Sequence, residues 1–398
     1  MAKPSMGPPI IKGNPSTPFL FPSFSKSKSK RLVPMATASA SSPRPNQPSL
    51  LVFSVVTSGG TAFNGVVEEL KKLTTRVAHV LPVSDDGGST AEIVRVLGGP
   101  AVGDIRSRCL RLSDQSTCEA LAVRTLLGHR LPLDAPLAKL EWYDIVEGEH
   151  PLWTGVSRPY RETIQAFLVY FQNEILRRHN ESFCFSNGSI GNFFFAGARI
   201  FFQSLDAAIF LFSRVSDIPT ESLVLPVIST NDRLTLGCEL WDGTIIRGQN
   251  EISHPTGGIM QPVNKGCSSV PALPSRIKRV FYMSSEGGNL LHEVFPLVNS
   301  AVLDQLSNVD CIVYAMGSLF TSVCPSLPSQ YINTLLVPKE GEIPIDAHCL
   351  ATQGIFNVIF VDSIRDPKVG VIFNPNSLIN ALANVVAKYM STNDIMEG

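Results

Sequence analysis

The sequence predicts a Rossmann-like, doubly wound α/β fold with a mainly parallel sheet, a helical insertion and a β-hairpin. Two apolar runs of strand length, Leu50–Val56 and Val77–Val83, each end in a turn that contains glycine. Between them, apolar residues recur at helical spacing from Val66 to Leu73. A strand, a turn, a helix and a second strand in this order form a βαβ unit, whose two strands are parallel.

Further apolar runs predict the remaining strands and a closing helix. The stretch Leu234–Ile246 predicts a hairpin that turns at Asp242-Gly243. Asn376–Met390 predicts an amphipathic helix. A chain of 398 residues suits one large α/β domain or two smaller ones, and we assign residues 50–392 to one domain. Five other runs predict strands: Leu223–Ile228, Val280–Met283, Cys311–Ala315, Thr334–Val337 and Val358–Val361.

Two helical stretches stand between the predicted strands. Residues 132–181 are polar and aromatic, and we interpret them as a helical insertion that serves either as a lid or as ordinary packing. Tyr160–His179 within this insertion predicts a long helix. Phe193–Phe212 is strongly apolar, but three polar residues interrupt it. It therefore predicts a buried helix rather than a membrane span.

Overall charge and cysteine spacing exclude several classes of function. The net charge of −1 gives no general attraction to nucleic acid or to a membrane, so any phosphate must bind at a local site. The eight cysteines contain no C-x-x-C pair, and no two stand at zinc-ligand spacing. This pattern favours scattered reduced thiols over a zinc centre.

The first 49 residues have the composition of an organelle targeting peptide. The chain has no acidic residue before Glu68, whereas lysine, arginine, serine and proline are frequent. Such a segment is typical of a transit peptide, and the serine and proline content favours the chloroplast over the mitochondrion. A disordered arm without a targeting role is the alternative. We therefore exclude residues 1–49 from the predicted fold.

The turns after the first two predicted strands are candidates for phosphate and metal binding. Ser58-Gly59-Gly60-Thr61 precedes a helix, and the free N–H groups of a helix N-terminus attract phosphate. Asp85 and Asp86 follow the second strand and stand before Gly87-Gly88-Ser89. Two adjacent acids can hold a ribose or a Mg²⁺ ion that bridges phosphates, although a structural turn is the alternative. The full G-x-G-x-x-G fingerprint is absent, which disfavours a standard NAD site.

Three more clusters of glycine and polar residues adjoin predicted strands or helices. Gly103-Asp104-Ile105-Arg106-Ser107-Arg108 combines an acid with two guanidinium groups that suit phosphate. Ser189-Ile190-Gly191-Asn192 precedes an apolar helix, and Gly317-Ser318 follows a predicted strand. Each cluster alone could be a helix cap or a surface turn. Because all of them adjoin a parallel sheet, we expect them to form one site.

Taken together, these blocks resemble the CofD/YvcK-like family. One branch of this family comprises 2-phospho-L-lactate transferases, and the other comprises regulators that bind nucleotide sugars. The resemblance implies a Rossmann-like sheet that holds a nucleotide diphosphate ligand, with a homodimer as a compatible state. The matching blocks run in the family's order from about Leu50 to about Tyr389: Ser58–Thr61, Val83–Ser89, Gly103–Arg106, Ser189–Asn192 and Gly317–Ser322.

The resemblance also implies roles for individual residues. Asp85 and Asp86 would carry catalysis and bind a Mg²⁺ ion that assists the transfer of a phosphoester group. Residues that would contact the phosphates and the nucleotide are Gly59, Gly60, Thr61, Gly87, Gly88, Ser89, Asp104, Arg106, Ser189, Gly191, Asn192, Gly317 and Ser318.

The sequence departs from the family pattern in three places. No histidine stands at Asn187 or Gly188, where the family often has one, and Arg365-Asp366-Pro367 also lacks the family's histidine. After about Leu327 the chain runs almost directly into the strand predicted at Thr334, so a helix and a strand are expected to be missing.

Three functions remain open from the sequence. The first is a Mg²⁺-dependent transferase that moves a phosphate-linked group, of the 2-phospho-L-lactate type, from a nucleotide diphosphate donor to an alcohol acceptor. Such chemistry needs acids for the metal and N–H groups for phosphate, and the sequence offers both. The second is a non-catalytic regulator that binds a nucleotide sugar. An NAD-dependent oxidoreductase is the least favoured.

Overall fold

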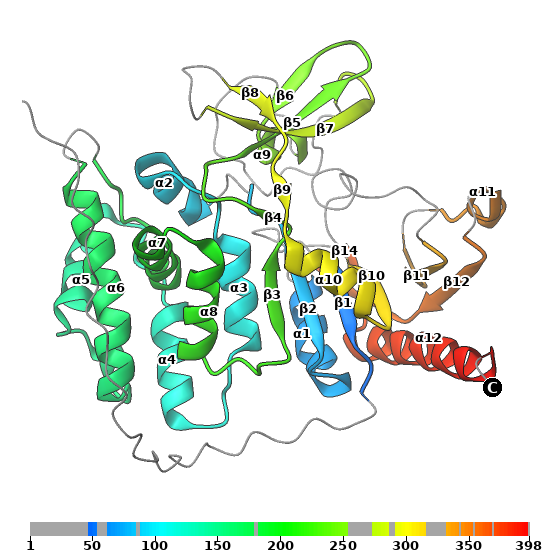
Figure 1. Cartoon of the computed structure of the whole chain (residues 1–398), viewed down its shortest axis with the longest axis horizontal. Helices are drawn as coiled ribbons and strands as arrows, with labels where there is room; N and C mark the ends of the chain where they lie inside the picture. Colours follow the sequence, from blue (N-terminus) through cyan, green and yellow to red (C-terminus); the bar gives the residue numbers. More distant parts are fainter. Residues whose placement is uncertain are drawn as a thin grey trace, which may run out of the picture. The chain divides into compact units, whose positions relative to one another are not determined.

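The computed structural model describes residues 47–53, 62–84, 88–178, 182–253, 273–285, 291–315, 332–341, 344–352, 355–367 and 370–396 (Figure 1). The chain divides into two units, Met1–Arg44 and Pro45–Gly398. All described residues belong to the second unit, and the fold below is that of this unit alone.

A parallel sheet of four strands lies at the centre of the fold (Figure 1). Its strands are β1 (Leu50–Phe53), β2 (Val77–Leu81), β3 (Leu223–Pro226) and β10 (Cys311–Tyr314), in the order β10-β1-β2-β3. Each neighbouring pair is parallel. Strands β2 and β3 follow on one side of β1, whereas β10 lies on the other side of β1. The strand order therefore reverses between β1 and β10. This arrangement confirms the predicted parallel sheet.

Helices cover both faces of this sheet, as a doubly wound fold requires. Leu50 and Val52 of β1 belong to the main core, together with apolar residues of α1 (Ala62–Leu73) and α12 (Pro375–Met396). Leu51 points to the opposite face and packs in a second cluster with Val302 of α10 (Ser300–Asn308). Because successive side chains of a strand alternate between faces, a continuous apolar run is what a sheet buried on both sides needs.

A helical region lies between β2 and β3 in the sequence. It comprises α2 (Gly88–Leu97), α3 (Gly103–Leu112), α4 (Cys118–Gly128), α5 (Ala135–Glu147), α6 (Arg158–Leu176), α7 (Ile190–Phe202) and α8 (Leu205–Val215), with a 3₁₀ turn at Pro151–Trp153. The expected insertion, residues 132–181, contains α5, the 3₁₀ turn and α6. The long helix expected at Tyr160–His179 corresponds to α6.

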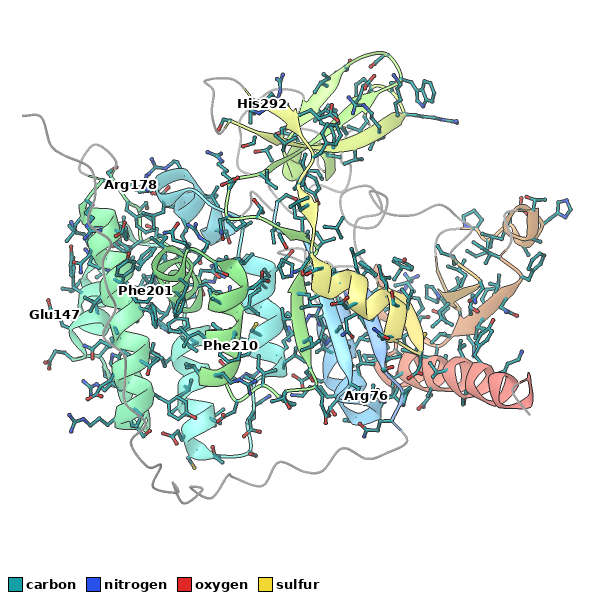
Figure 2. The ribbon with its side chains drawn as sticks, in the orientation of Figure 1. Arg76, Glu147, Arg178, Phe201, Phe210 and His292 are labelled. Atoms are coloured by element: carbon teal, nitrogen blue, oxygen red, sulfur yellow. The ribbon has the colours of Figure 1, made fainter. Side chains whose placement is uncertain are left out.

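The single helix expected over Phe193–Phe212 is wrong, because the chain forms two helices there. Gln203 adopts a left-handed conformation with φ of 52° and ends α7. The Ser204 hydroxyl then accepts a hydrogen bond from the Ala207 N–H at 3.2 Å and caps α8. The first half of the stretch is buried as expected, but Phe201 and Phe210, labelled in Figure 2, are 55% and 62% exposed. Among the described residues, no helix has both the length and the apolar character to cross a membrane.

A second sheet is antiparallel and contains the predicted hairpin. Its order is β6 (Ile245–Arg247), β5 (Thr235–Leu240), β7 (Ile277–Ser284) and β8 (His292–Val294). Gly243, with φ of 86°, supplies the turn between β5 and β6. The short helix α9 (Gln249–Ser253) follows β6, and a two-stranded ribbon pairs β4 (Ile228–Ser229) with β9 (Leu297–Val298).

The C-terminal strands form small separate sheets. The strand expected near Thr334 is present as β11 (Thr334–Pro338), but it pairs with β12 (Asn357–Val361) and not with β10. The pair β13 (Ser363–Asp366) and β14 (Gly370–Phe373) is antiparallel, and α11 (Ala347–Thr352) stands between β11 and β12 in the sequence. The sequence around Leu327, where a helix and a strand are expected to be missing, lies outside the described residues.

Candidate ligand-binding site

The structure describes part of the predicted site. Asp104, Arg106, Ser189, Gly191 and Asn192 are described in full, and Gly88 and Ser89 are described as the first residues of α2. The other predicted site residues lie outside the described part of the chain: Gly59, Gly60, Thr61, Asp85, Asp86, Gly87, Gly317 and Ser318.

The ends of three strands show where the predicted motifs outside the described residues leave the sheet. β1 ends at Phe53, β2 at Leu81 and β10 at Tyr314, and one of these glycine motifs follows each strand in the sequence. Because the strands are parallel neighbours, their carboxyl ends meet at one edge of the sheet. In open α/β sheets, ligands bind at this edge, at the point where the strand order reverses. That point lies between β1 and β10.

The N-terminus of α3 packs against the first turn of α2. A Cβ atom added to Gly103 would lie 2.7 Å from the Thr90 Oγ1 atom, so glycine permits this approach. The Ala101 N–H also donates a hydrogen bond of 2.8 Å to the Val83 carbonyl, just after β2. α3 is therefore attached to the carboxyl end of β2, directly beside the start of α2.

The N-terminus of α7 meets the first turn of α3. The Arg106 Nε atom donates a hydrogen bond of 3.1 Å to the Asn192 Oδ1 atom. A Cβ atom added to Gly191 would lie 2.5 Å from the Leu127 carbonyl oxygen and 3.0 Å from the Arg106 Cγ atom. The structure thus joins two of the predicted motifs, which stand 86 residues apart in the sequence. We call the first turns of α2, α3 and α7 (Gly88–Thr90, Gly103–Arg106 and Ser189–Asn192) the three-helix cluster.

Arginines around the three-helix cluster give this part of the structure an excess of positive charge, because Arg108 and Arg130 are charged neighbours of Arg106 and Asp104. Burial and, to a smaller extent, the nearby charge of Arg130 lower the pKa of the Arg106 guanidinium to about 10, although Asp104 opposes both effects. Arg108 on the same helix is fully buried, and burial followed by the charge of Arg111 lowers its pKa to about 9. An anion bound here would favour the charged guanidinium groups and would also complement the helix N-termini.

The Ser189 hydroxyl is a second indication of a ligand. Ser189 is fully buried and occupies the N-cap position of α7, yet its side chain accepts no hydrogen bond from the helix. No partner for its Oγ atom is found among the described residues. A buried hydroxyl without a partner is unfavourable by about 1–3 kcal/mol, so a ligand group at this position would stabilise the protein.

Two residues of this region, Thr90 and Arg130, are not predicted from the sequence. Thr90 is buried where Gly103 approaches α2, and its position directly after the Gly87-Gly88-Ser89 motif is a signal that the sequence carries. Arg130 lies just beyond α4, forms a β-bridge with Ser189 and donates a hydrogen bond of 2.7 Å to the Asn187 carbonyl. Its distance in sequence from every glycine motif leaves no comparable signal.

The predicted metal ligands Asp85 and Asp86 are outside the described residues. Ser84, directly before them, is buried and lies three residues beyond the end of β2. Among the described residues, no group of three or more His, Cys, Asp or Glu side chains could hold a metal ion.

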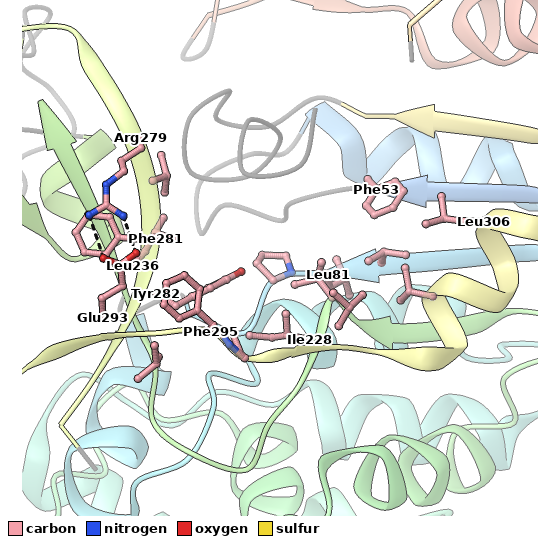
Figure 3. Close-up of a pocket in the computed structure, with 18 of the residues that line it drawn as sticks. Phe53, Leu81, Ile228, Leu236, Arg279, Phe281, Tyr282, Glu293, Phe295 and Leu306 are labelled. Atoms are coloured by element: carbon pink, nitrogen blue, oxygen red, sulfur yellow. Dashed lines mark hydrogen bonds and ion pairs between the residues drawn. The ribbon is translucent and has the colours of Figure 1, made fainter. Parts of the chain in front are cut away.

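A large apolar cavity opens at the same edge of the sheet (Figure 3). Its volume is about 530 Å³, and its walls come from the carboxyl ends of β1, β2 and β10, from α10, and from the antiparallel sheet. Phe53 and Tyr314, at the ends of β1 and β10, stack with ring centroids 5.2 Å apart. No sequence motif predicts this cavity.

Comparison with known proteins identifies the family. The sequence matches the family described as 2-phospho-L-lactate transferase CofD over residues 54–343. It is 34% identical over 330 residues to an uncharacterized protein of Saccharomyces cerevisiae, covering 69% of this chain and 72% of that protein. The gluconeogenesis factor of Bacillus subtilis is 24% identical over 301 residues, which cover 76% of this chain and 65% of the relative. The putative gluconeogenesis factor of Clostridium acetobutylicum is 24% identical over 286 residues, which cover 72% of this chain and 46% of the relative.

A solved structure supports the same assignment at the level of the fold. A crystal structure of a UPF0052-family protein from Bacillus halodurans superposes with a TM-score of 0.53 at 19% identity, covering 84% of this chain and 99% of that chain. This likeness agrees with the α/β fold described above. The family match over residues 54–343 and the 34% identity to the yeast protein show that this chain belongs to the CofD family.

Proposed function

We propose that the protein binds a nucleotide diphosphate ligand at the carboxyl edge of the parallel sheet, with the phosphates at the three-helix cluster. The observation that carries this proposal is the hydrogen bond between Arg106 and Asn192, which joins the first turns of α3 and α7 beside α2. Several N–H groups from helix termini and a guanidinium group at one place suit a diphosphate. The unpartnered Ser189 hydroxyl supports the same ligand.

We further propose that the protein is a transferase that moves a phosphate-linked group, of the 2-phospho-L-lactate type, from the nucleotide diphosphate to an alcohol acceptor. The family description supports this reaction class. Asp85 and Asp86 directly follow the buried Ser84 beyond the end of β2, where two carboxylates would hold a Mg²⁺ ion against the phosphates. The ion would neutralise charge on the phosphates during transfer.

A regulator that binds a nucleotide sugar is the second candidate. The names of the Bacillus subtilis and Clostridium acetobutylicum relatives favour it, because both are gluconeogenesis factors. Dependence on Mg²⁺ separates the two functions, since a transferase needs the ion for turnover and a regulator would release its ligand unchanged. Native mass spectrometry of the purified chain would identify the nucleotide that co-purifies and whether it is altered after incubation with Mg²⁺.

The test of the binding site is calorimetric titration of the full chain with GDP, UDP and ADP in the presence of Mg²⁺. We expect Arg106→Gln to weaken binding of the preferred nucleotide at least tenfold, about 1.4 kcal/mol, because it removes the charge and the hydrogen bond to Asn192. Arg158→Gln is the matched control, because Arg158 is exposed on α6 and pairs only with Glu162 among the described residues. Equal affinities of the Arg106 variant and the control would contradict the proposed phosphate site.

The test of the metal site is the double variant Asp85→Asn and Asp86→Asn. Asparagine keeps the hydrogen bonds that form a turn but removes both charges. We expect the variant to keep its thermal melting temperature and to lose the dependence of nucleotide affinity on Mg²⁺. If affinity still rises with Mg²⁺ as in the unmodified protein, these acids do not hold the ion.

A further inference from the structure

The lining of the apolar cavity described above disfavours a phosphate group. Among the described residues, Arg279 and Glu293 are the only charged residues that line it, and they pair with each other through two contacts of 2.6 and 3.0 Å. Arg279 also bonds Glu239 at 2.7 Å. The guanidinium charge is thus already compensated by two carboxylates. A phosphate or another ion in this cavity would find no uncompensated opposite charge among the described residues and would lose its hydration.

The remaining lining is aliphatic and aromatic. Val80, Ile228 and Val302 contribute aliphatic walls, and Phe53 and Tyr314 form the stacked pair at the strand ends. A volume of about 530 Å³ lies within the range of small-molecule sites. Burial of an uncharged organic molecule in such a lining is favourable by roughly 25 cal/mol for each Å² of apolar surface removed from water.

Tyr282 of β7 provides a polar group inside this apolar lining. Its hydroxyl points toward the carboxyl end of β2, near Leu81 (Figure 3). Burial raises the pKa of this phenol, so it is a neutral hydrogen-bond donor at physiological pH. No hydrogen bond of this hydroxyl to another described residue is present. Tyr314 also lines the cavity, where it stacks on Phe53. An oriented donor such as the Tyr282 hydroxyl in an apolar cavity selects a ligand with a matching polar group.

The cavity is also close to the site of the proposed metal. Pro82 lines the cavity, and Asp85 follows it by three residues. Three residues span at most about 10 Å even when fully extended. A ligand in the cavity can therefore place one end within reach of a phosphate group held at the strand ends.

We propose that this cavity is a second ligand site, which binds a neutral, hydrophobic alcohol whose hydroxyl is hydrogen-bonded by Tyr282. This ligand binds together with the nucleotide and does not replace it. Its role as the acceptor rests on the transferase function proposed above. The binding of a neutral alcohol does not rest on that function, and the experiment therefore measures binding alone.

The test compares two neutral probes of nearly equal shape, 2-naphthol and 2-methylnaphthalene, by calorimetric titration of the full chain without nucleotide. We expect saturable binding of both probes, with 2-naphthol about three- to tenfold tighter because it adds one buried hydrogen bond. Tyr282→Phe removes only the hydroxyl, and we expect it to abolish this preference while the affinity for 2-methylnaphthalene stays within twofold. Tyr170→Phe, on α6 and outside the cavity lining, is the matched control and keeps the preference.

A second variant keeps the proposal falsifiable if Tyr282→Phe is poorly folded. Leu306 lines the cavity from α10 and is 37% exposed, so Leu306→Trp fills space with little effect on the core. We expect it to weaken both probes at least tenfold. Absence of saturable probe binding, or a preference for 2-naphthol that survives in Tyr282→Phe, overturns the proposal. Competition between 2-naphthol and GDP overturns the statement that the two ligands bind together.

Discussion

Glycine at position 191 allows α7 to approach both α3 and the end of α4. The added Cβ of any other residue would meet the Leu127 carbonyl oxygen at 2.5 Å, which is closer than Cβ atoms of folded proteins come to their neighbours. It would also press on the aliphatic part of Arg106 at 3.0 Å. Because Gly191 has no Cβ, the Arg106 guanidinium group and the N-terminus of α7 can lie next to each other. Both belong to the proposed phosphate site.

We predict that Gly191→Ala lowers both stability and ligand affinity. The clash involves backbone, which cannot rotate away as a side chain can, so we expect a loss of about 1–3 kcal/mol in the free energy of unfolding. Gly128→Ala is the matched control, because its Cβ would have Leu110 Cδ1 at 3.7 Å as its nearest atom. Urea denaturation and GDP titration measure the two effects. Similar results for the two variants would show that the close approach at Gly191 is unimportant.

At the level of single residues, the sequence names candidates for the site but does not predict which of them contact each other. Asp104, Arg106, Ser189 and Asn192 were expected at one edge of the sheet because parallel strands bring their carboxyl ends together. The bond between Arg106 and Asn192 depends on how α3 and α7 pack across the intervening helices, and no local pattern encodes it. Cavity residues such as Tyr282 look in the sequence like ordinary core residues.

The elements of the fold differ in how well local patterns predicted them. The strands of the parallel sheet were expected because long apolar runs suit strands buried on both faces. The break between α7 and α8 was missed because apolar residues continue across it, although Ser204 followed by Asp206 is a signal for a new helix. The pairing of β11 with β12 was also unforeseen, since register between distant strands depends on the whole chain.

Strands β1 and β10 are joined at their first residues by a small hydrogen-bond network. The Ser49 N–H and hydroxyl both donate to the Asp310 Oδ2 atom, at 2.7 and 2.6 Å. The Asp310 N–H donates in return to the Ser49 carbonyl at 3.1 Å. These hydrogen bonds to the carboxylate lower the pKa of Asp310 below its ordinary value. They hold together the two strands between which the strand order reverses.

We predict that this network stabilises the protein in a pH-dependent way. A carboxyl whose pKa is lower in the folded state contributes stability above its unfolded pKa of about 3.9, and this contribution is lost as the pH falls through the folded pKa. Asp310→Asn should therefore lower the urea midpoint at pH 7 and have a smaller effect near pH 3. The effect of Asp310→Asn on the urea midpoint at pH 7 should be smaller in a Ser49→Ala background, because Ser49 and Asp310 share these hydrogen bonds. An equal effect at both pH values would contradict a charge-dependent role.

At the scale of the whole molecule, the chain consists of a short N-terminal unit and one large unit. Met1–Arg44 forms the first, and Pro45–Gly398 contains all of the described helices and strands. The residues that matched the family, 54–343, lie entirely within the second unit. The boundary lies close to residue 49, where the basic segment without acids gives way to β1.

We predict that the N-terminal segment is a chloroplast transit peptide and that the mature protein begins within residues 35–50. A basic, acid-free and serine-rich segment suits import, and β1 begins only at Leu50. Incubation of the full chain with isolated chloroplasts, followed by N-terminal sequencing of the imported protein, measures the cleavage site. Mitochondria provide the control for targeting. Protein that stays outside the chloroplasts, or enters with Met1 intact, would rule out this role.

The region between β10 and β11 bears on whether this form of the chain is complete. Within the described residues, β10 pairs only with β1, and β11 pairs only with β12. A cavity of about 230 Å³ lies between these two strands and against apolar residues of α12. Ile312 of β10 lines this cavity and is 40% exposed. An additional strand between β10 and β11 would pack against these apolar residues.

We predict that the 398-residue form aggregates or requires a partner, and that a longer form with a strand and a helix inserted after Leu327 is the active one. Burial of each large apolar side chain contributes roughly 1.5–3 kcal/mol, and a strand with its helix buries several. A whole domain is stable by only about 5–15 kcal/mol, so the missing unit would account for a comparable amount. Exposed strand edges also favour association between chains. Size-exclusion chromatography with light scattering, together with a thermal melt, would compare the two forms. The prediction is wrong if the shorter form is a soluble monomer that melts cooperatively and binds GDP as tightly as the longer form.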